Sequence, residues 1–308
     1  MKTIIALILS LLLTFVSIST GVNPEKPSLS ISFDDGSTQD FPGYPNKIWN
    51  EMFLESLKKH DLQAIFYVKG IAMDNPRGKK VVKSWDNAGH LIANHTYSHK
   101  YYHSKKITLD FYKNDFLRDD KFIKNYKNYT KFFRFPYLKA GNTIEKRDGF
   151  RKFLSEQNYR RGYVSIDASD WFIDSRLCKK LETGEEVELE KYKKYYIEHM
   201  MDRASYYDSL GYELTGRQVK HTLLFHHNLA AALFMDDLIT AFKAEGWEII
   251  DPMESYSDPI YEEPADILPD GESIIWAKAK QSGKFDDILR YPAEDGDYLI
   301  DEMDKLGL

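Results

Sequence analysis

The chain has 308 residues and a formal net charge of −6, and 43% of its residues are hydrophobic. This length and composition can bury the core of one large domain or two small ones, which excludes a largely disordered protein. No long run of basic residues occurs, and this argues against a nucleic-acid partner.

The N-terminus is predicted to be a targeting segment. Lys2 precedes an apolar run over 4–16, and small residues follow, a pattern typical of a secretory signal peptide over 1–21. The apolar run is short for a membrane span, which needs about 20 residues, and this favours a cleaved signal. An uncleaved anchor is the alternative. We expect an exported protein, periplasmic or secreted, without a stable membrane span after cleavage. Its single cysteine, Cys178, excludes a disulfide framework.

Strand-like and helix-like segments then alternate along the chain. The hydrophobic spacing predicts strands at 27–33, 63–70, 90–99, 131–138, 160–171, 221–228 and 247–252, and helices at 46–62, 78–89, 109–129, 149–159, 184–210 and 234–246. This βαβα alternation predicts an α/β fold with a parallel sheet, either open or closed into a barrel.

The last part of the chain has a different composition. Residues 252–270 are rich in Pro, Asp, Glu and Tyr and are interpreted as a linker, and the tail from 271 has a short helical pattern. Because that tail is too short for a core of its own, we expect it to fold back on the domain. The predicted organisation is a catalytic domain over 22–255 and a C-terminal extension over 256–308.

Polar side chains gather where the predicted strands end. In parallel α/β folds the functional groups lie at the carboxyl ends of the strands. Five predicted strands end in such groups, namely Asp34-Asp35, His95 with His99, Arg134-Phe135-Pro136-Tyr137, Asp167 with Asp170-Trp171, and His226-His227. Each group alone is a weak signal, but together they predict one active site.

The adjacent acids Asp34 and Asp35 suggest a bound cation. His95 and His99 are four residues apart, so both imidazoles can face one point on a helical turn or in a tight loop. Such a pair alone is more often a pair of surface histidines, but beside two acids it favours a metal site. Two imidazoles and one carboxylate form the protein side of a zinc-type centre, with Asp35 as the third ligand. Asp34 would then be free to act as a base toward water.

The motifs "SFDDG", "HTYSH", "RFPY", "DASDW" and "LLFHH", in this order, resemble those of the NodB-homology polysaccharide deacetylases, carbohydrate esterase family four. The resemblance covers roughly residues 27–255. It implies a distorted (β/α) barrel, a divalent metal (zinc first, with cobalt, nickel or manganese as alternatives) and removal of acetyl groups from sugars. The expected partner is an N-acetylated polysaccharide, and the predicted signal peptide favours a cell-wall substrate, with peptidoglycan ahead of a chitin-like oligosaccharide.

The resemblance also implies a role for each matching residue. Asp34 would be the general base, held by Arg134, and the backbone N–H of Tyr137 would help to stabilise the oxyanion. Asp170 would orient His226 as the general acid. Asp35, His95 and His99 would ligate the metal, and Trp171 and Leu224 would form the wall for the acetyl methyl group.

Several alternatives remain open from the sequence. Arg134 and Asp170 could form structural ion pairs, and Trp171 and Leu224 could simply pack in the core. Asn228 follows His226-His227 where the family commonly has an acid, so either histidine could face the site; we favour His226, because Leu224 lies on the same face of the strand. The rival functions are an O-acetyl polysaccharide esterase and a catalytically inactive carbohydrate-binding protein.

Overall fold

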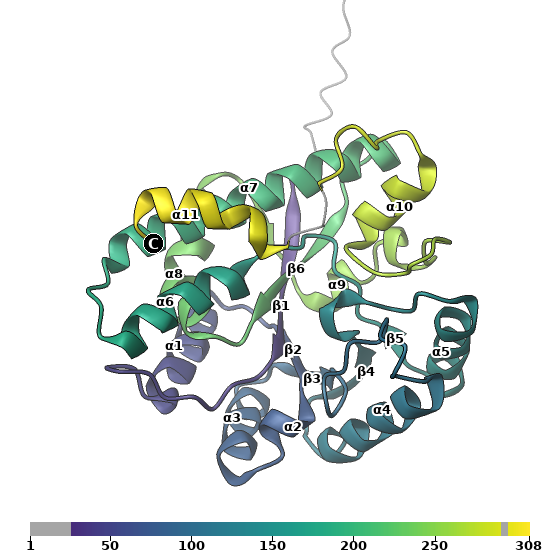
Figure 1. Cartoon of the computed structure of the whole chain (residues 1–308), viewed down its shortest axis with the longest axis horizontal. Coiled ribbons are helices and arrows are strands. Elements are labelled where there is room, and N and C mark those ends of the chain that lie inside the picture. The colour runs from purple at the N-terminus through teal and green to yellow at the C-terminus, as the bar shows by residue number, and fades with distance from the viewer. Residues whose placement is uncertain (1–25, 291–294) are drawn as a thin grey trace, which may run out of the picture.

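A parallel β-sheet forms the centre of the fold (Figure 1). The computed structural model describes residues 26–290 and 295–308, and in these residues seven strands form one sheet in the order β5-β4-β3-β2-β1-β6, with β7 paired to the start of β1. The strands are β1 (Ser28–Asp35), β2 (Ile65–Val68), β3 (Leu91–Asn94), β4 (Tyr129–Phe133), β5 (Arg160–Arg161), β6 (Lys220–His226) and β7 (Glu248–Ile249).

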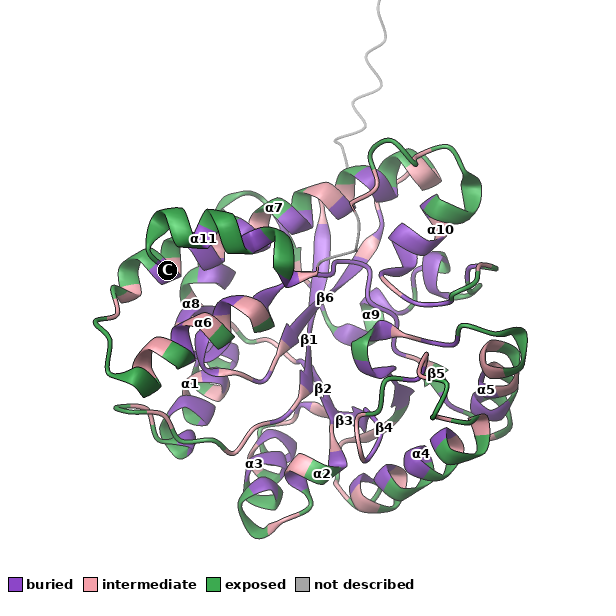
Figure 2. Cartoon of the chain, in the orientation of Figure 1, coloured by how far each residue is buried: buried purple, intermediate pink, exposed green. Residues whose placement is uncertain are grey.

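Helices surround this sheet and turn their buried faces toward it (Figure 2). Strand β1 is buried from Ser28 to Asp34, as expected for a parallel strand that is covered on both faces. The longer helices are α1 (Asn46–Lys59), α3 (Pro76–Asn87), α4 (Leu109–Ile123), α5 (Ile144–Glu156), α6 (Asp170–Thr183), α7 (Leu189–Thr215) and α8 (Leu229–Ala244). Shorter ones are α2 (Gly70–Met73), η1 (Pro136–Leu138), α9 (Pro252–Ser255), η2 (Pro259–Tyr261), α10 (Ile274–Ser282), η3 (Gly296–Leu299) and α11 (Ile300–Leu306).

The two edges of the sheet are joined by the segment 160–168. At its start, Arg161 pairs with Phe133 of β4, and further along Ile166 forms a parallel bridge to Leu223 of β6. The backbone N–H of Leu224 donates to the carbonyl of Ile166 at 3.1 Å. The sheet is therefore curled into a distorted (β/α) barrel, which confirms the predicted fold class.

The prediction is wrong in two places along this part of the chain. The strand predicted over 160–171 shrinks to the two residues of β5, because the rest of the segment crosses from one sheet edge to the other. Helix α6 was not predicted as an element, and it begins at Asp170, directly at the motif "DASDW". The long helix predicted over 184–210 is α7, which starts and ends about five residues later.

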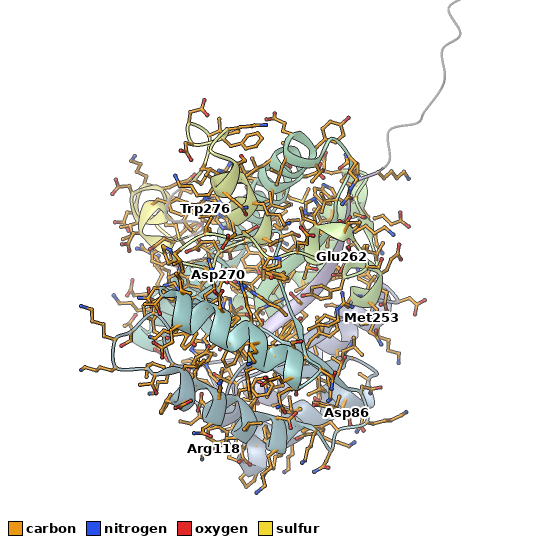
Figure 3. All side chains as sticks on the ribbon, turned by 90° about the vertical axis from the view of Figure 1, so that its right-hand side faces the viewer. Asp86, Arg118, Met253, Glu262, Asp270 and Trp276 are labelled. Carbon is orange, nitrogen blue, oxygen red and sulfur yellow. The ribbon has the colours of Figure 1, made fainter. Side chains whose placement is uncertain are left out.

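The segment predicted as a linker is packed into the domain. Helices α9 and η2 lie within it, and Tyr256, Asp258 and Tyr261 are buried. Asp270 is buried as well and pairs with Arg151 and Arg161. In Figure 3, which views the side of the molecule that carries α4 and α5, Asp270 and Trp276 lie above these two helices. The linker interpretation is therefore wrong for 252–261 and at Asp270.

Within the described residues, no helix is long and apolar enough to cross a membrane. The predicted signal peptide over 1–21 lies outside the described residues. Cys178 is a buried, free cysteine of α6.

Candidate metal centre and active site

A cavity of about 550 Å³ lies at the carboxyl ends of the strands. Eight of the ten residues predicted for the site line it, and the other two, Arg134 and Asp170, are buried directly behind Asp34 and His226. The eight are Asp34, Asp35, His95, His99, Tyr137, Trp171, Leu224 and His226. The structure thus brings all the predicted site residues together.

Asp35, His95 and His99 form a candidate metal centre. One ligand atom from each lies within 4.8 Å of the others, and in the described parts of the chain no other group of three His, Cys, Asp or Glu residues meets this condition. Nε2 of His99 is 3.0 Å from Oδ1 of Asp35, and Nε2 of His95 is 3.7 Å from the same oxygen. Two imidazole nitrogens and one carboxylate oxygen suit zinc and related divalent ions.

The protonation of these groups fits a metal ligand set. Nδ1 of His95 lies 2.9 Å from the carbonyl oxygen of Arg134, so Nδ1–H donates there and the lone pair of Nε2 faces Asp35. Burial lowers the pKa of His95 to about 4, which keeps the imidazole neutral. Burial opposes ionisation of Asp35, but His99, Lys69 and His95 outweigh it and hold the pKa of this carboxyl well below its usual range.

One carboxylate oxygen of Asp35, Oδ1, is buried without a hydrogen-bond partner among the described residues. The Nε2 atoms of His99 and His95 lie 3.0 and 3.7 Å from it. A buried carboxylate oxygen without a hydrogen-bond partner requires an explanation, and a bound ion is one. The residues therefore fit a divalent metal.

Left-handed backbone conformations concentrate at this site. Of the eight non-glycine residues with positive φ in the described chain, six line the cavity or lie in the motif "HTYSH": Asp35, Thr96, His99, Tyr137, Leu138 and Glu272. For the β-branched Thr96, at φ 64°, this conformation is costly, and such strain clusters at functional sites. Gly36 has φ 100°, and a Cβ there would lie 2.9 Å from Met73, so only glycine allows this sharp turn after the two acids.

Asp34 is held by a buried arginine. Nη1 of Arg134 donates to Oδ1 of Asp34 at 2.7 Å, while Oδ2 of Asp34 lies 3.6 Å from Nε2 of His95, on the side of the metal centre. Nε of Arg134 donates to the carbonyl of Gly162, and Nη2 donates to the hydroxyl of Tyr256. Since each of the three guanidinium nitrogens makes a hydrogen bond, Arg134 is held in place and in turn orients Asp34.

His226 pairs with Asp170 on the opposite wall. Nδ1 of His226 lies 2.7 Å from Oδ1 of Asp170, and Oδ2 accepts the backbone N–H of His226 and the side-chain amide of Asn228. Burial alone would lower the pKa of His226, but Asp170, with Asp35 and Asp34, raises it to about 9. The imidazole is therefore protonated at neutral pH, with its Nε2–H on the cavity side.

His227 points away from this pair into a box of aromatic rings. It stacks on Phe53 and Phe66, each at 5.2 Å between ring centroids. Its Nδ1 accepts the backbone N–H of Ser37, and burial lowers its pKa to about 3. His227 is a neutral core histidine, so it is His226 that faces the site, as favoured from the sequence.

The remaining predicted residues lie at the cavity wall. Tyr137 has φ 56°, and its ring lies 4.7 Å from that of His99. In the described chain its backbone N–H donates to no other backbone group. Trp171 is 42% exposed and so is not a core residue, whereas Leu224 is buried and packs with Leu138 and Val164.

Comparison with known proteins agrees with this geometry. Residues 21–152 match the family model of polysaccharide deacetylase. Over this segment the chain is similar to polysaccharide deacetylases. The matched segment holds the candidate metal centre and the Asp34–Arg134 pair, whereas Asp170 and His226 follow it.

Two curated proteins that match the chain are named for peptidoglycan chemistry. The peptidoglycan-N-acetylglucosamine deacetylase of Bacillus cereus is 31% identical over 147 residues, which are 47% of each chain. The peptidoglycan-N-acetylmuramic acid deacetylase PdaA of Bacillus subtilis is 25% identical over 183 residues, 59% of this chain and 58% of that protein. The chain spans about half the length of these relatives.

Solved structures share the fold. The peptidoglycan deacetylase PdaC of Bacillus subtilis aligns with a TM-score of 0.51 at 19% identity, over 77% of this chain and 93% of that one. A carbohydrate esterase family 4 pseudoenzyme of Bacillus anthracis aligns with a TM-score of 0.51 at 17% identity, over 75% of this chain and 66% of that one.

Several residues of the site lie outside the predicted set. Lys69 follows β2 and places Nζ 3.2 Å from Oδ2 of Asp35. Lys139 and Glu272 form an ion pair at the cavity wall, and Asp295 comes from the C-terminal extension. Lys69 lies at the end of the strand predicted over 63–70, so the strand-end rule could have found it; Glu272 and Asp295 had no such signal. Asp167, left without a role from the sequence, also lines the cavity.

Proposed function

We propose that this protein is an exported, metal-dependent hydrolase that removes N-acetyl groups from an N-acetylated glycan, with peptidoglycan ahead of a chitin-like oligosaccharide. One observation carries the proposal: a single cavity joins the Asp–His–His set, the Asp34–Arg134 pair and the His226–Asp170 pair. The names of the curated relatives support peptidoglycan as the substrate, and the signal-like N-terminus supports export.

Hydrolysis of an amide needs an activated water, a stabilised oxyanion and a proton for the leaving amine. A divalent metal held by Asp35, His95 and His99, zinc in the first place, would supply Lewis acidity toward the acetyl carbonyl and the water. Cobalt, nickel and manganese are the alternatives. Asp34 is proposed as the base, since Arg134 fixes its Oδ1 and its Oδ2 faces the centre.

The other side of the cavity is proposed to handle the leaving group. His226 is protonated at neutral pH and gives its Nε2 proton to the amine. Asp170 stabilises the protonated imidazole and orients it through Nδ1. The backbone N–H of Tyr137 contributes to oxyanion stabilisation. Trp171 and Leu224 are proposed as the wall that receives the acetyl methyl group.

An inactive carbohydrate-binding role is disfavoured by the residues themselves. The fold alone does not separate the two, since a pseudoenzyme shares it. What supports activity is that the metal, base and acid positions all carry competent side chains in hydrogen-bonded or charged pairs.

The proposed domain organisation is a signal peptide over 1–21, a catalytic domain over 22–255 and an extension over 256–308 on the same domain. The contacts of residues 256–308 support the proposal that this extension packs on the catalytic domain. Helix α10 packs on α7, and Glu272 and Asp295 reach the cavity.

The experiment that tests the function is mass spectrometry of acetate loss from defined N-acetylglucosamine oligomers and from peptidoglycan fragments. We expect deacetylated products, loss of activity with a chelator and recovery on addition of Zn²⁺. The Asp34→Asn variant is the matched control for background hydrolysis. Absence of product from both substrate classes would overturn the proposal, and unchanged turnover after chelation would overturn its metal dependence.

A further inference from the structure

Lys69 lies beside the candidate metal centre in a position fixed by the sheet. Asp35 and Val68 are partners in the β1–β2 register, and the backbone N–H of Lys69 donates to the carbonyl of Asp35 at 2.8 Å. The lysine side chain, only 22% exposed, turns back so that its Nζ lies 3.2 Å from Oδ2 of Asp35. The contact is therefore built into the strand pairing and is not a chance surface ion pair.

The two oxygens of Asp35 face two different kinds of partner. Oδ1 faces the imidazoles of His99 and His95, at 3.0 and 3.7 Å, and Oδ2 faces the ammonium of Lys69. A metal between the imidazoles and Oδ1 can therefore bind Asp35 while Lys69 keeps its contact with the other oxygen. The lysine and the metal would share one carboxylate.

Each of the two adjacent acids thus pairs with a positively charged side chain. Arg134 pairs with Asp34 at 2.7 Å, and Lys69 pairs with Asp35 at 3.2 Å. Two neighbouring carboxylates would otherwise repel each other when no metal is bound. When a divalent ion is bound, Lys69 becomes a like charge within a few ångströms of it, in a partly buried setting where screening is weak.

We propose that Lys69 is the counter-ion of Asp35, which stabilises the metal-free site and weakens the binding of a divalent cation. This inference rests on the proposed function only in taking the Asp35–His95–His99 centre to bind metal. Lys69 is a positioning residue, since it acts through Asp35. The ammonium of Lys69 thus has two effects. It stabilises the Asp35 carboxylate in the absence of metal, and it repels the cation when metal is bound.

The same cavity offers a matched control. Lys139 also lines it, but its ammonium is already paired with Glu272. Replacement of Lys139 changes the net charge of the cavity by the same amount as replacement of Lys69, without removing a partner of Asp35. A difference between the two variants therefore reports the contact with Asp35 and not the overall charge.

The test measures Zn²⁺ affinity of the full chain by competition with a chromophoric chelator, together with thermal unfolding of the metal-free protein. We expect Lys69→Met to bind Zn²⁺ about tenfold more tightly or better, and to unfold at a lower temperature without metal. Lys69→Arg, which keeps the charge, should remain within about threefold of the wild type, as should Lys139→Met. Lys69→Gln provides a second neutral variant if Lys69→Met does not fold.

An affinity of Lys69→Met or Lys69→Gln that is equal to or weaker than that of the wild type would overturn the proposal. Equal tightening by Lys139→Met would overturn it too, since the effect would then come from overall charge. A wild-type chain that binds no Zn²⁺, Co²⁺, Ni²⁺ or Mn²⁺ would overturn the metal centre itself. Wild-type binding thus tests the proposed function, and the ratio between variants tests the role of Lys69.

Discussion

The imidazole of His226 and the carboxylate of Asp170 lie 2.7 Å apart, although 56 residues separate them in the chain. The closing segment 160–168 brings them together, because it pairs with β6 at Ile166 just before α6 begins with Asp170. This carboxylate is the largest of the influences that raise the pKa of His226 to about 9. The pair therefore controls the range of pH in which the acid is charged.

The first prediction concerns pH. Activity should fall as the pH rises through about 9, because His226 then loses the proton it donates. In Asp170→Asn the favourable charge is removed, and the alkaline limb of the pH–rate profile should move down by roughly 1–3 pH units. An unmoved limb in a folded variant would argue against the acid role.

The same pair should affect stability in a defined direction. The folded pKa is above the ordinary value of about 6.5, so the stabilisation by the pair is complete below that pH and is lost as the pH rises through about 9. Urea unfolding of wild type and Asp170→Asn at pH 6 and pH 10 measures it. The gap between the two proteins should be larger at pH 6.

A second prediction separates the roles of the adjacent acids. Asp35→Asn should chiefly weaken metal binding, whereas Asp34→Asn should keep the metal and lose about 10²–10⁴-fold in turnover. Metal content by elemental analysis and kcat of the metal-loaded proteins measure the two effects. Similar metal loss in both variants would show that Asp34 and Asp35 do not have separate roles as base and metal ligand.

A third prediction distinguishes amide from ester chemistry. His226→Ala should reduce hydrolysis of an N-acetylated oligomer far more than that of an activated acetate ester, because an activated ester has a good leaving group and needs no proton. The ratio of the two rates, in mutant and wild type, is the measurement. If both rates fall by the same factor, His226 is not the acid.

A fourth prediction concerns Tyr256, in the segment once interpreted as a linker. Its hydroxyl bonds Nη2 of Arg134, the hydroxyl of Tyr67 and the carbonyl of Tyr163. Tyr256→Phe leaves these buried groups unsatisfied and should cost about 1–3 kcal/mol in the free energy of unfolding. Urea denaturation measures it, and Tyr212→Phe, at an exposed position, serves as the control.

The sequence predicts the site well where chemistry follows a strand. Asp34, Asp35, His95, His99 and His226 come directly after or at the end of regular hydrophobic segments, and parallel strands end at one edge. Their convergence follows from topology without any knowledge of distances.

The supporting contacts follow from no local pattern. Tyr256 reaches Arg134 across 122 residues, and Lys139 meets Glu272 across 133. A proline- and acid-rich stretch resembles a linker in composition, and only the packed fold shows that its tyrosines fill the barrel. Helix α6 was not predicted, because the strand predicted over 160–171 included its first two residues, Asp170 and Trp171.

The left-handed residues around the cavity have a consequence for how the site is made. Asp35, Thr96, His99 and Tyr137 pay a conformational cost that only the completed surroundings can offset. A fragment that stops before Ile166 would keep every metal ligand in its sequence but would lack the bridge to β6 and the acid that follows it. The metal ligands and the Asp170–His226 pair therefore meet in one cavity only when both parts of the chain are folded together.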